Sequence, residues 1–148
     1  MSMKAIMNKW WFFLSISSML FLANACPDKD IDYSDSTITI HNNTDKVVLH
    51  YFDFYRYPDT SLMLDNPFFD EKQLELAIIE PNNSIEQEDA WLKYFEQPNT
   101  SKVMLYLIDK NVFDGQSWDT IKANYLVLKR YDLGLDDLNR MNWTITYP

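Results

Sequence analysis

A charge-free run from Trp10 to Leu22 separates the start of this chain from the rest. Its 13 residues follow two lysines, Lys4 and Lys9, and as a helix they extend about 20 Å at roughly 1.5 Å per residue. A bilayer core of about 30 Å needs roughly 20 apolar residues, so this run is too short for a permanent membrane span. The pattern is typical of an export signal, which is removed and contributes nothing to the mature fold.

The four residues Ala23-Asn24-Ala25-Cys26 indicate where this signal ends. One interpretation is a site for ordinary signal peptidase, which cuts after small residues in an A-x-A pattern. The other is that Leu22 to Cys26 resembles the lipobox of bacterial lipoproteins, with its large aliphatic residue four positions before the cysteine instead of the usual three. Both interpretations predict cleavage between Ala25 and Cys26.

Cys26 is the only cysteine of the chain. A free terminal thiol would be unusual in an oxidising compartment, so we expect Cys26 to carry a lipid. Bacterial lipoproteins carry three acyl chains, and two or more chains hold a protein stably at a membrane. The sequence therefore predicts a membrane partner reached through the lipid on Cys26, and a place at the outer membrane of a bacterial cell envelope.

Residues 26–35 form a short polar segment that contains Asp28, Asp30, Asp32 and Asp35. Charge-rich segments of this kind are typical of solvated linkers, and we expect an acidic tether. Acidic residues soon after the cysteine also resemble the surface-export signal of Bacteroidota lipoproteins. The tether is thus compatible with either the surface or the periplasmic face of the outer membrane.

Charge and composition exclude several functions for the remainder of the chain. Residues 1–25 hold two of the 13 basic residues and none of the 22 acidic ones, so the other 123 residues carry a formal charge of −11. This charge repels nucleic acid. With only two glycines, a glycine-rich phosphate loop is excluded. We expect no cofactor, and stability must come from apolar burial, because no second cysteine is present to form a disulfide within the chain.

Short apolar runs separated by turn residues predict a single β-rich domain over residues 36–148. Expected strands cover 37–40, 47–54, 74–78, 84–88, 103–108, 126–128 and 143–147, and expected short helices cover 90–96, 118–124 and 135–138. The first two strands predict a hairpin around 42–45, and the second has apolar residues on both faces. The expected fold is an antiparallel β-sandwich or an α+β sheet with short helices, after the N-terminal signal helix. The long connection 55–70 is a candidate functional loop.

Four stretches resemble a family of small, uncharacterised lipoproteins of Bacteroidota. They are Asn42 to Lys46, Tyr57 to Leu62, Leu128 to Leu133 and Asn142 to Pro148. The resemblance covers nearly the whole domain, and the ending is its most specific part. It implies a lipoprotein in the envelope, and no activity or catalytic residue is carried over with it.

Two sets of titratable residues are candidates for a metal site or for a catalytic site. His41 and His50 are the only histidines and flank the first predicted turn, but zinc needs three or four ligands, so we expect no metal site. Asp132, Asp136 and Asp137 lie near Lys129, Arg130 and Arg140. Two facing carboxylates can do acid–base work in a hydrolase, but acidic pairs are common in so acidic a chain, and we assign no catalytic residue.

Two further stretches are candidates for ligands or modification. The aromatic stretch 51–57 offers a stacking face for a sugar or peptide, although alternation places half of it in the core. Asp35-Ser36-Thr37 and Asp119-Thr120-Ile121 resemble the O-glycosylation pattern of Bacteroidota.

These features together predict a non-enzymatic binding or accessory module that recognises a protein or glycan. A glycan or peptide hydrolase using paired carboxylates, and a structural, fimbria-like subunit assembling by strand addition, are the alternatives.

Overall fold

The computed structural model describes residues 36–98 and 101–148. This part of the chain forms seven strands in two sheets and five short helices, which confirms the mainly β fold with short helices. The predicted signal helix, the cleavage site at Ala25 and Cys26 and the acidic tether 26–35 lie outside the described residues. No helix among the described residues is long and apolar enough to cross a membrane.

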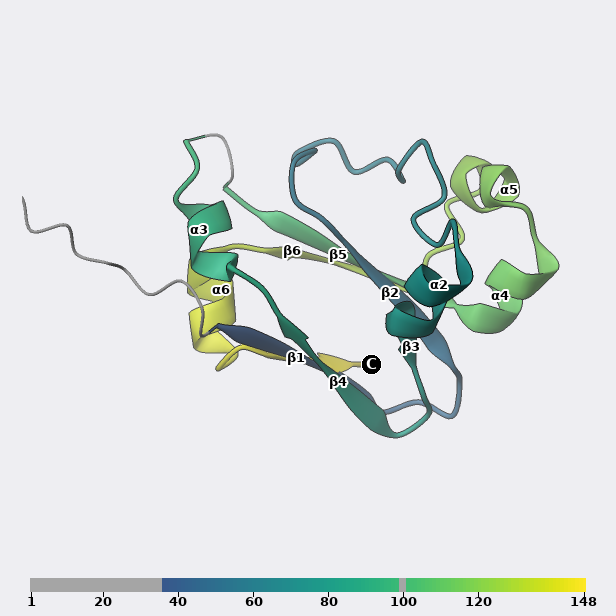
Figure 1. Ribbon diagram of the computed structural model, residues 1–148, viewed down its shortest axis with the longest axis horizontal. Coiled ribbons are helices and arrows are strands. Elements are labelled where there is room, and N and C mark those ends of the chain that lie inside the picture. Colours follow the sequence, from purple (N-terminus) through teal and green to yellow (C-terminus); the bar gives the residue numbers. More distant parts are fainter. Residues whose placement is uncertain (1–35, 99–100) are drawn as a thin grey trace, which may run out of the picture. The chain divides into compact units, whose positions relative to one another are not determined.

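The two sheets are built from strands that are distant in sequence (Figure 1). The three-stranded sheet has the order β4 (Asn83–Glu88), β1 (Thr37–Asn42), β7 (Thr144–Tyr147), with β1 antiparallel to β4 and parallel to β7. The four-stranded sheet is antiparallel and has the order β3 (Ile78–Ile79), β2 (Val48–Asp53), β5 (Val103–Asp109), β6 (Lys129–Leu133).

Strand β5 separates two hydrophobic cores, because its side chains alternate between the faces of the sheet. Val103, Leu105 and Leu107 belong to the core that also contains residues of β1 and β7. Met104, Tyr106 and Ile108 belong to a second core, which is closed by residues of loop 54–70 and by helix α5 (Trp118–Ala123). All seven residues of β5 are buried, and full burial stabilises each large apolar side chain by about 1.5–3 kcal/mol.

The short helices lie at two ends of the sheets (Figure 1). Helices α3 (Trp91–Phe95) and α6 (Leu135–Arg140) lie at one end, and α2 (Glu71–Ala77), α4 (Lys110–Gly115) and α5 lie at the other. The predictions for α3, α5 and α6 are confirmed, and the Ser117 hydroxyl caps α5 by accepting a hydrogen bond from the Thr120 N–H.

The predicted hairpin between the first two strands is wrong, because β1 and β2 lie in different sheets. Asn42 is 1% exposed, and its amide Nδ2 donates to the carbonyl of Lys46 at 2.7 Å and to those of Ile79 and Glu80 at 3.1 Å each. This side chain holds the turn against the end of β3, so the chain crosses between the sheets. The turn residues at 42–45 indicate that the chain reverses there, but the same residue types occur whether the next strand lies in the same sheet or in another one.

The predicted strand 74–78 is also wrong: most of it belongs to α2. The Asp70 carboxylate caps this helix by accepting the Gln73 N–H at 2.8 Å. Strong helix formers dominate the segment, and an alternation over only three apolar positions does not separate strand from helix.

Two boundaries after β5 also differ from the sequence prediction. Residues 110–115, where the sequence predicted neither helix nor strand, form helix α4, which Asp109 caps by accepting the Asn111 N–H at 2.9 Å. The expected strand 126–128 is irregular, and β6 begins at Lys129. Tyr125 has a φ of 47° and its carbonyl accepts the Val127 N–H at 2.8 Å. The apolar run after it packs against the two cores, and the Leu128 N–H donates to the Leu107 carbonyl of β5 at 2.9 Å.

Candidate functional site

A groove of about 600 Å³ opens between β2, the end of β4, helix α2 and loop 54–70. We call it the aromatic groove. It is lined chiefly by Phe52, Phe54, Phe68, Phe69, Leu76 and Trp91, together with two acidic residues, Asp65 and Asp89. Its volume lies within the range of about 300–1,000 Å³ that is usual for ligand sites.

A packed cluster of aromatic rings forms the floor of the aromatic groove. Trp91 is 1% exposed, and its ring centroid lies 4.8 Å from that of Phe52 and 5.5 Å from that of Phe54. The indole N–H of Trp91 donates to the Gln87 carbonyl at 2.9 Å, and Phe54 stacks on Tyr94 with centroids 4.3 Å apart. Ring pairs at these distances stabilise by about 0.5–1.5 kcal/mol beyond area burial, so this side of the groove is preformed.

The groove is bordered by apolar side chains that the fold does not bury. Phe69 is 75% exposed and Leu76 is 60% exposed. Tyr55 and Leu64, which belong to the same loop as Phe69, are 76% and 80% exposed but do not line the groove. Single exposed apolar residues need no explanation, but two that line one groove, as Phe69 and Leu76 do, are typical of a binding surface.

The polar groups of the groove give it acidic character. Asp65 and Asp89 are exposed, and Asp89 Oδ1 accepts the Ala90 N–H at 2.7 Å. None of the described residues that line the groove is a lysine or arginine. His50 is 5% exposed with its Nδ1 2.9 Å from the Ala77 carbonyl oxygen, and burial lowers its pKa, so the ring is neutral at neutral pH.

A buried ion pair holds the loop beside the groove. Arg56 Nε lies 2.6 Å from Asp53 Oδ2, and Asp53 is only 4% exposed. The other nitrogens of Arg56 donate to the carbonyls of Ser61 and Leu62. One guanidinium thus ties the end of β2 to the middle of loop 54–70, while Trp118 and Lys122 donate to the carbonyls of Met63 and Leu64 in the later part of the loop.

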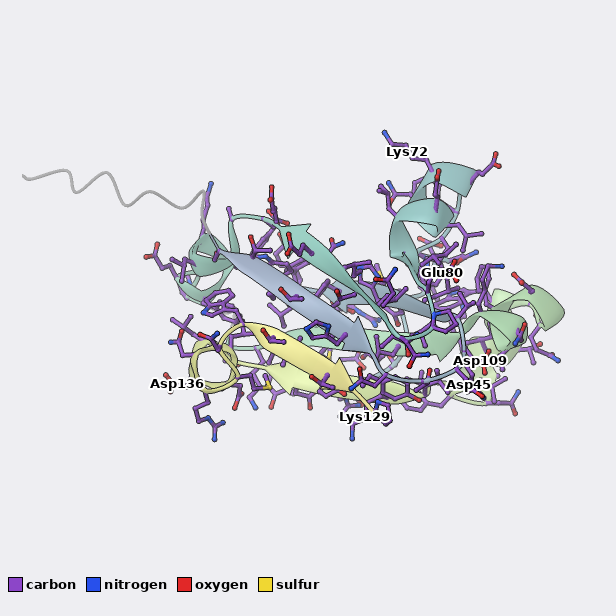
Figure 2. The ribbon with its side chains drawn as sticks, turned by 90° about the horizontal axis from the view of Figure 1, so that it is seen from below. Asp45, Lys72, Glu80, Asp109, Lys129 and Asp136 are labelled. Atoms are coloured by element: carbon purple, nitrogen blue, oxygen red, sulfur yellow. The ribbon has the colours of Figure 1, made fainter. Side chains whose placement is uncertain are left out.

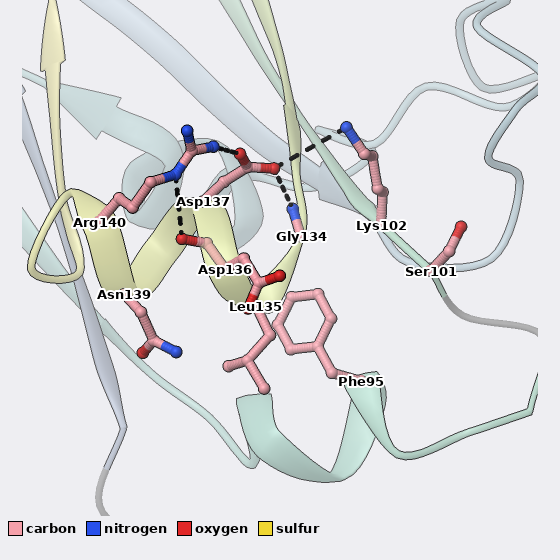
Figure 3. Close-up of a pocket in the computed structure, with 9 residues that line it drawn as sticks. All are labelled: Phe95, Ser101, Lys102, Gly134, Leu135, Asp136, Asp137, Asn139 and Arg140. Atoms are coloured by element: carbon pink, nitrogen blue, oxygen red, sulfur yellow. Dashed lines mark hydrogen bonds and ion pairs between the residues drawn. The ribbon is translucent and has the colours of Figure 1, made fainter.

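Two residues of the acidic cluster near the C-terminus, Asp136 and Asp137, line a second hollow of about 850 Å³ (Figure 3). Asp137 accepts the Gly134 N–H at 3.0 Å and is paired with Arg140 and with Lys102. The hydrogen bond from Gly134, with the two cations, holds the pKa of Asp137 below its usual range. Figure 3 shows the Asp136 carboxylate on a different side of α6, as expected for helix neighbours about 100° apart.

Asp132 and Asp137 line a further hollow of about 390 Å³, and each is bound to a cation. Asp132 pairs with Arg130 through contacts of 2.8 and 3.2 Å, while the Lys129 ammonium lies 5.7 Å from the ring centroid of Tyr131. A general acid at neutral pH needs a raised pKa, whereas that of Asp137 is lowered. The cluster therefore suits helix capping and ion pairing better than acid–base catalysis.

The two histidines are not brought together, since His41 lies on β1 and His50 on β2 of the other sheet. Within residues 36–98 and 101–148, no group of three His, Cys, Asp or Glu side chains is placed to hold a metal ion. Of the two modification motifs, Thr120 lies in α5 with its hydroxyl 2.9 Å from that of Ser117, and Asp35 lies outside the described residues.

Both faces of the aromatic stretch 51–57 pack against a core, so the expected division into a buried and an exposed half is not seen. Tyr51 belongs to the second core and Phe52 and Phe54 pack against the first, and all three line the aromatic groove. Trp91 and Leu76 were not identified from the sequence as groove residues, because both come from helices far along the chain. The length of the connection 55–70 and the aromatic stretch 51–57 were the sequence signals that pointed to this region.

No protein-family model, curated protein or solved structure matches this chain. The lipoprotein family that the sequence resembles therefore stays a prediction.

Proposed function

We propose that this chain is a non-enzymatic binding module of the bacterial cell envelope, anchored to the outer membrane through a lipid on Cys26, and that the aromatic groove is its binding surface. The observation that carries the proposal is the pairing of a preformed aromatic floor with exposed Phe69 and Leu76 at one groove. A fold that needed these side chains only for stability would bury them.

Anchoring and binding are compatible in one molecule. A lipid on Cys26 would hold the module at the membrane without using any surface of residues 36–148. The groove is thereby left for a partner. The paired state of Asp132 and Asp137 favours a binding role over a hydrolase.

The test compares Phe69→Ser with Leu64→Ser in cells that express the full chain. Both changes remove a large exposed apolar side chain from loop 54–70, but only Phe69 lines the groove. After cross-linking, we expect a partner, protein or glycan, to be enriched with the wild type and with Leu64→Ser, and to be lost with Phe69→Ser. A partner that both variants retain, or the absence of any enriched partner, would contradict the groove as the binding surface.

A further inference from the structure

Strand β2 has an open edge at the aromatic groove. On one side β2 pairs with β5 along its whole length, from Val48 opposite Asp109 to Asp53 opposite Met104. On the other side β3 pairs only with Val48 and Leu49. The second half of β2 therefore lacks a neighbouring strand on the side of β3.

The register identifies which backbone groups face this edge. The Val47 carbonyl accepts the Lys110 N–H at 3.0 Å, so the odd-numbered residues of β2 direct their N–H and C=O toward β5. In an antiparallel ladder the next residues direct theirs to the other side. Phe52 thus presents its N–H and C=O to the open edge, and no residue of the described chain pairs with them. An unpaired strand edge is a template for an added strand.

The side chains near this edge suit an extended chain with an apolar residue. Phe52 and Trp91 form part of the floor, while Phe69 and Leu76 remain largely exposed. Strand addition takes its affinity from main-chain hydrogen bonds and its specificity from pockets for alternate side chains. The groove offers both elements in one place.

The charges select a basic segment. Asp65 and Asp89 line the groove, and Glu86 and Glu88 are exposed on the adjoining strand β4. A second copy of this chain fits poorly, because residues 26–148 carry a formal charge of −11 and like charges oppose association.

We propose that the aromatic groove binds an extended segment of a basic polypeptide, which pairs with the Phe52 backbone at the open edge of β2 and inserts a large apolar side chain between Phe69 and Trp91. This inference rests on the proposed function and names the partner class for the same groove. Lysine or arginine residues of the segment contact Asp65 and Asp89.

The probe is a fluorescein-labelled heptapeptide, Lys-Val-Lys-Phe-Lys-Val-Lys, and fluorescence anisotropy with the full processed protein measures its binding. Two matched peptides carry methyl groups on their backbone nitrogens, one peptide at the apolar residues and the other at the lysines. Because successive residues of a strand direct their N–H groups to opposite edges, each peptide loses the N–H donors of one edge and keeps its charge. We expect the peptide whose methylated edge faces β2 to bind at least about tenfold more weakly than the unmethylated peptide, which corresponds to about 1.4 kcal/mol, and the other to bind like the unmethylated peptide. A peptide with glutamate for every lysine, and one with serine for every apolar residue, should not bind.

On the protein side, the double change Asp65→Asn with Asp89→Asn should weaken binding by about tenfold, as two exposed charge pairs can do. Asp136→Asn is the control, since Asp136 is exposed on α6 and lines the hollow of Figure 3 instead of the aromatic groove; Figure 2 shows it on the opposite side of the domain from Lys72 of α2. Equal binding by both N-methylated peptides, equal weakening by Asp136→Asn, or binding of an N-acetylglucosamine tetramer without binding of the peptide would overturn the inference. If the peptide fails but Phe69→Ser still abolishes a cellular partner, only the partner class is wrong and the proposed function stands.

Discussion

At the residue scale, His50 shows how burial changes the chemistry of a side chain that the sequence marks as a possible ligand. The ring lies on β2 with its Nδ1 2.9 Å from the Ala77 carbonyl oxygen. A carbonyl oxygen only accepts, so this nitrogen carries a proton and donates. Burial lowers the pKa of His50, and the hydrogen bond to Ala77 opposes that change only in part. The ring therefore acts as a neutral structural donor between β2 and α2.

This arrangement predicts a pH dependence of stability. In the unfolded chain His50 takes up a proton as the pH falls through about 6.5, whereas the folded chain resists protonation because its pKa is lower. The stabilisation is thus complete above about pH 6.5 and is lost as the pH falls toward the folded pKa, at no more than about 1.4 kcal/mol per pH unit. Urea unfolding measured between pH 7 and 5 should show this loss.

His50→Asn keeps an amide donor near the position of Nδ1 but does not titrate, so its stability should be nearly flat over that pH range. His41→Asn is the matched control and should retain the wild-type slope, because it leaves His50 in place. A slope that disappears with His41→Asn instead would assign the effect to the wrong histidine. The lowered pKa values of Asp109 and Asp137 act only below about pH 4, outside this range.

At the scale of elements, Arg56 holds the first half of loop 54–70 to strand β2. Arg56 and Arg130 are similarly exposed, at 29% and 28% of the side chain, and each pairs with an aspartate. Their partners differ, since the Asp53 side chain is 4% exposed and that of Asp132 is 28% exposed. Removing Arg56 leaves a buried carboxylate without its cation, whereas removing Arg130 leaves a carboxylate that water still reaches.

We expect Arg56→Leu to lower the free energy of unfolding by about 2–3 kcal/mol, because an uncompensated buried charge is costly. Arg130→Leu should cost less than about 1 kcal/mol, as is usual for partly exposed pairs. Urea unfolding measures both values, and limited proteolysis should show faster cleavage within 55–70 for Arg56→Leu. Equal losses of stability would mean that the burial of Asp53 does not control the strength of the pair.

Short elements were the least predictable from sequence. In α2, the apolar spacing of Leu74, Leu76 and Ile78 suggested a strand, whereas the segment consists of strong helix formers and is capped by Asp70. Before β6, Tyr125 has a positive φ that no strand residue adopts, and the strand begins only at Lys129. Elements of four to seven residues contain too few turns of either period for the pattern alone to assign them.

At the scale of the whole molecule, anchoring and display are expected to depend on residues that precede the folded domain. Cys26→Ser should abolish lipid attachment, since the thioether requires the cysteine sulfur. The wild type should show the mass of the processed chain plus lipid and sediment with membranes, whereas the serine variant should lack that mass. A wild type that is soluble with a free Cys26 would contradict the lipoprotein prediction and move the search to soluble periplasmic partners.

The acidic tether offers a matched variant for the same experiment. Changing Asp28, Asp30 and Asp32 to asparagine leaves Cys26 and the lipid in place. If the tether directs surface export, this variant should stay in the membrane fraction but resist protease added to intact cells. Shaving equal to that of the wild type would remove the surface-export role and leave the lipid anchor unaffected.

Much of this protein follows from the sequence by itself. The unbroken apolar run from Val103 to Ile108 predicts a buried strand, the turn residues predict a mainly β domain, and the negative charge opposes nucleic-acid binding. These properties are local or compositional, so neighbouring residues suffice to specify them. The aromatic stretch 51–57 and the long connection after it also pointed to the region that contains the aromatic groove.

Only the tertiary structure decided how these pieces meet. The pairing of β1 with β4 and β7, and of β2 with β5, joins segments that are up to about a hundred residues apart, and no local pattern specifies such partners. The aromatic groove has the same origin, because Phe52, Phe69, Leu76 and Trp91 come from four separate segments. Its open edge exists because β3 pairs with only two residues of β2, a contact that depends on where α2 ends.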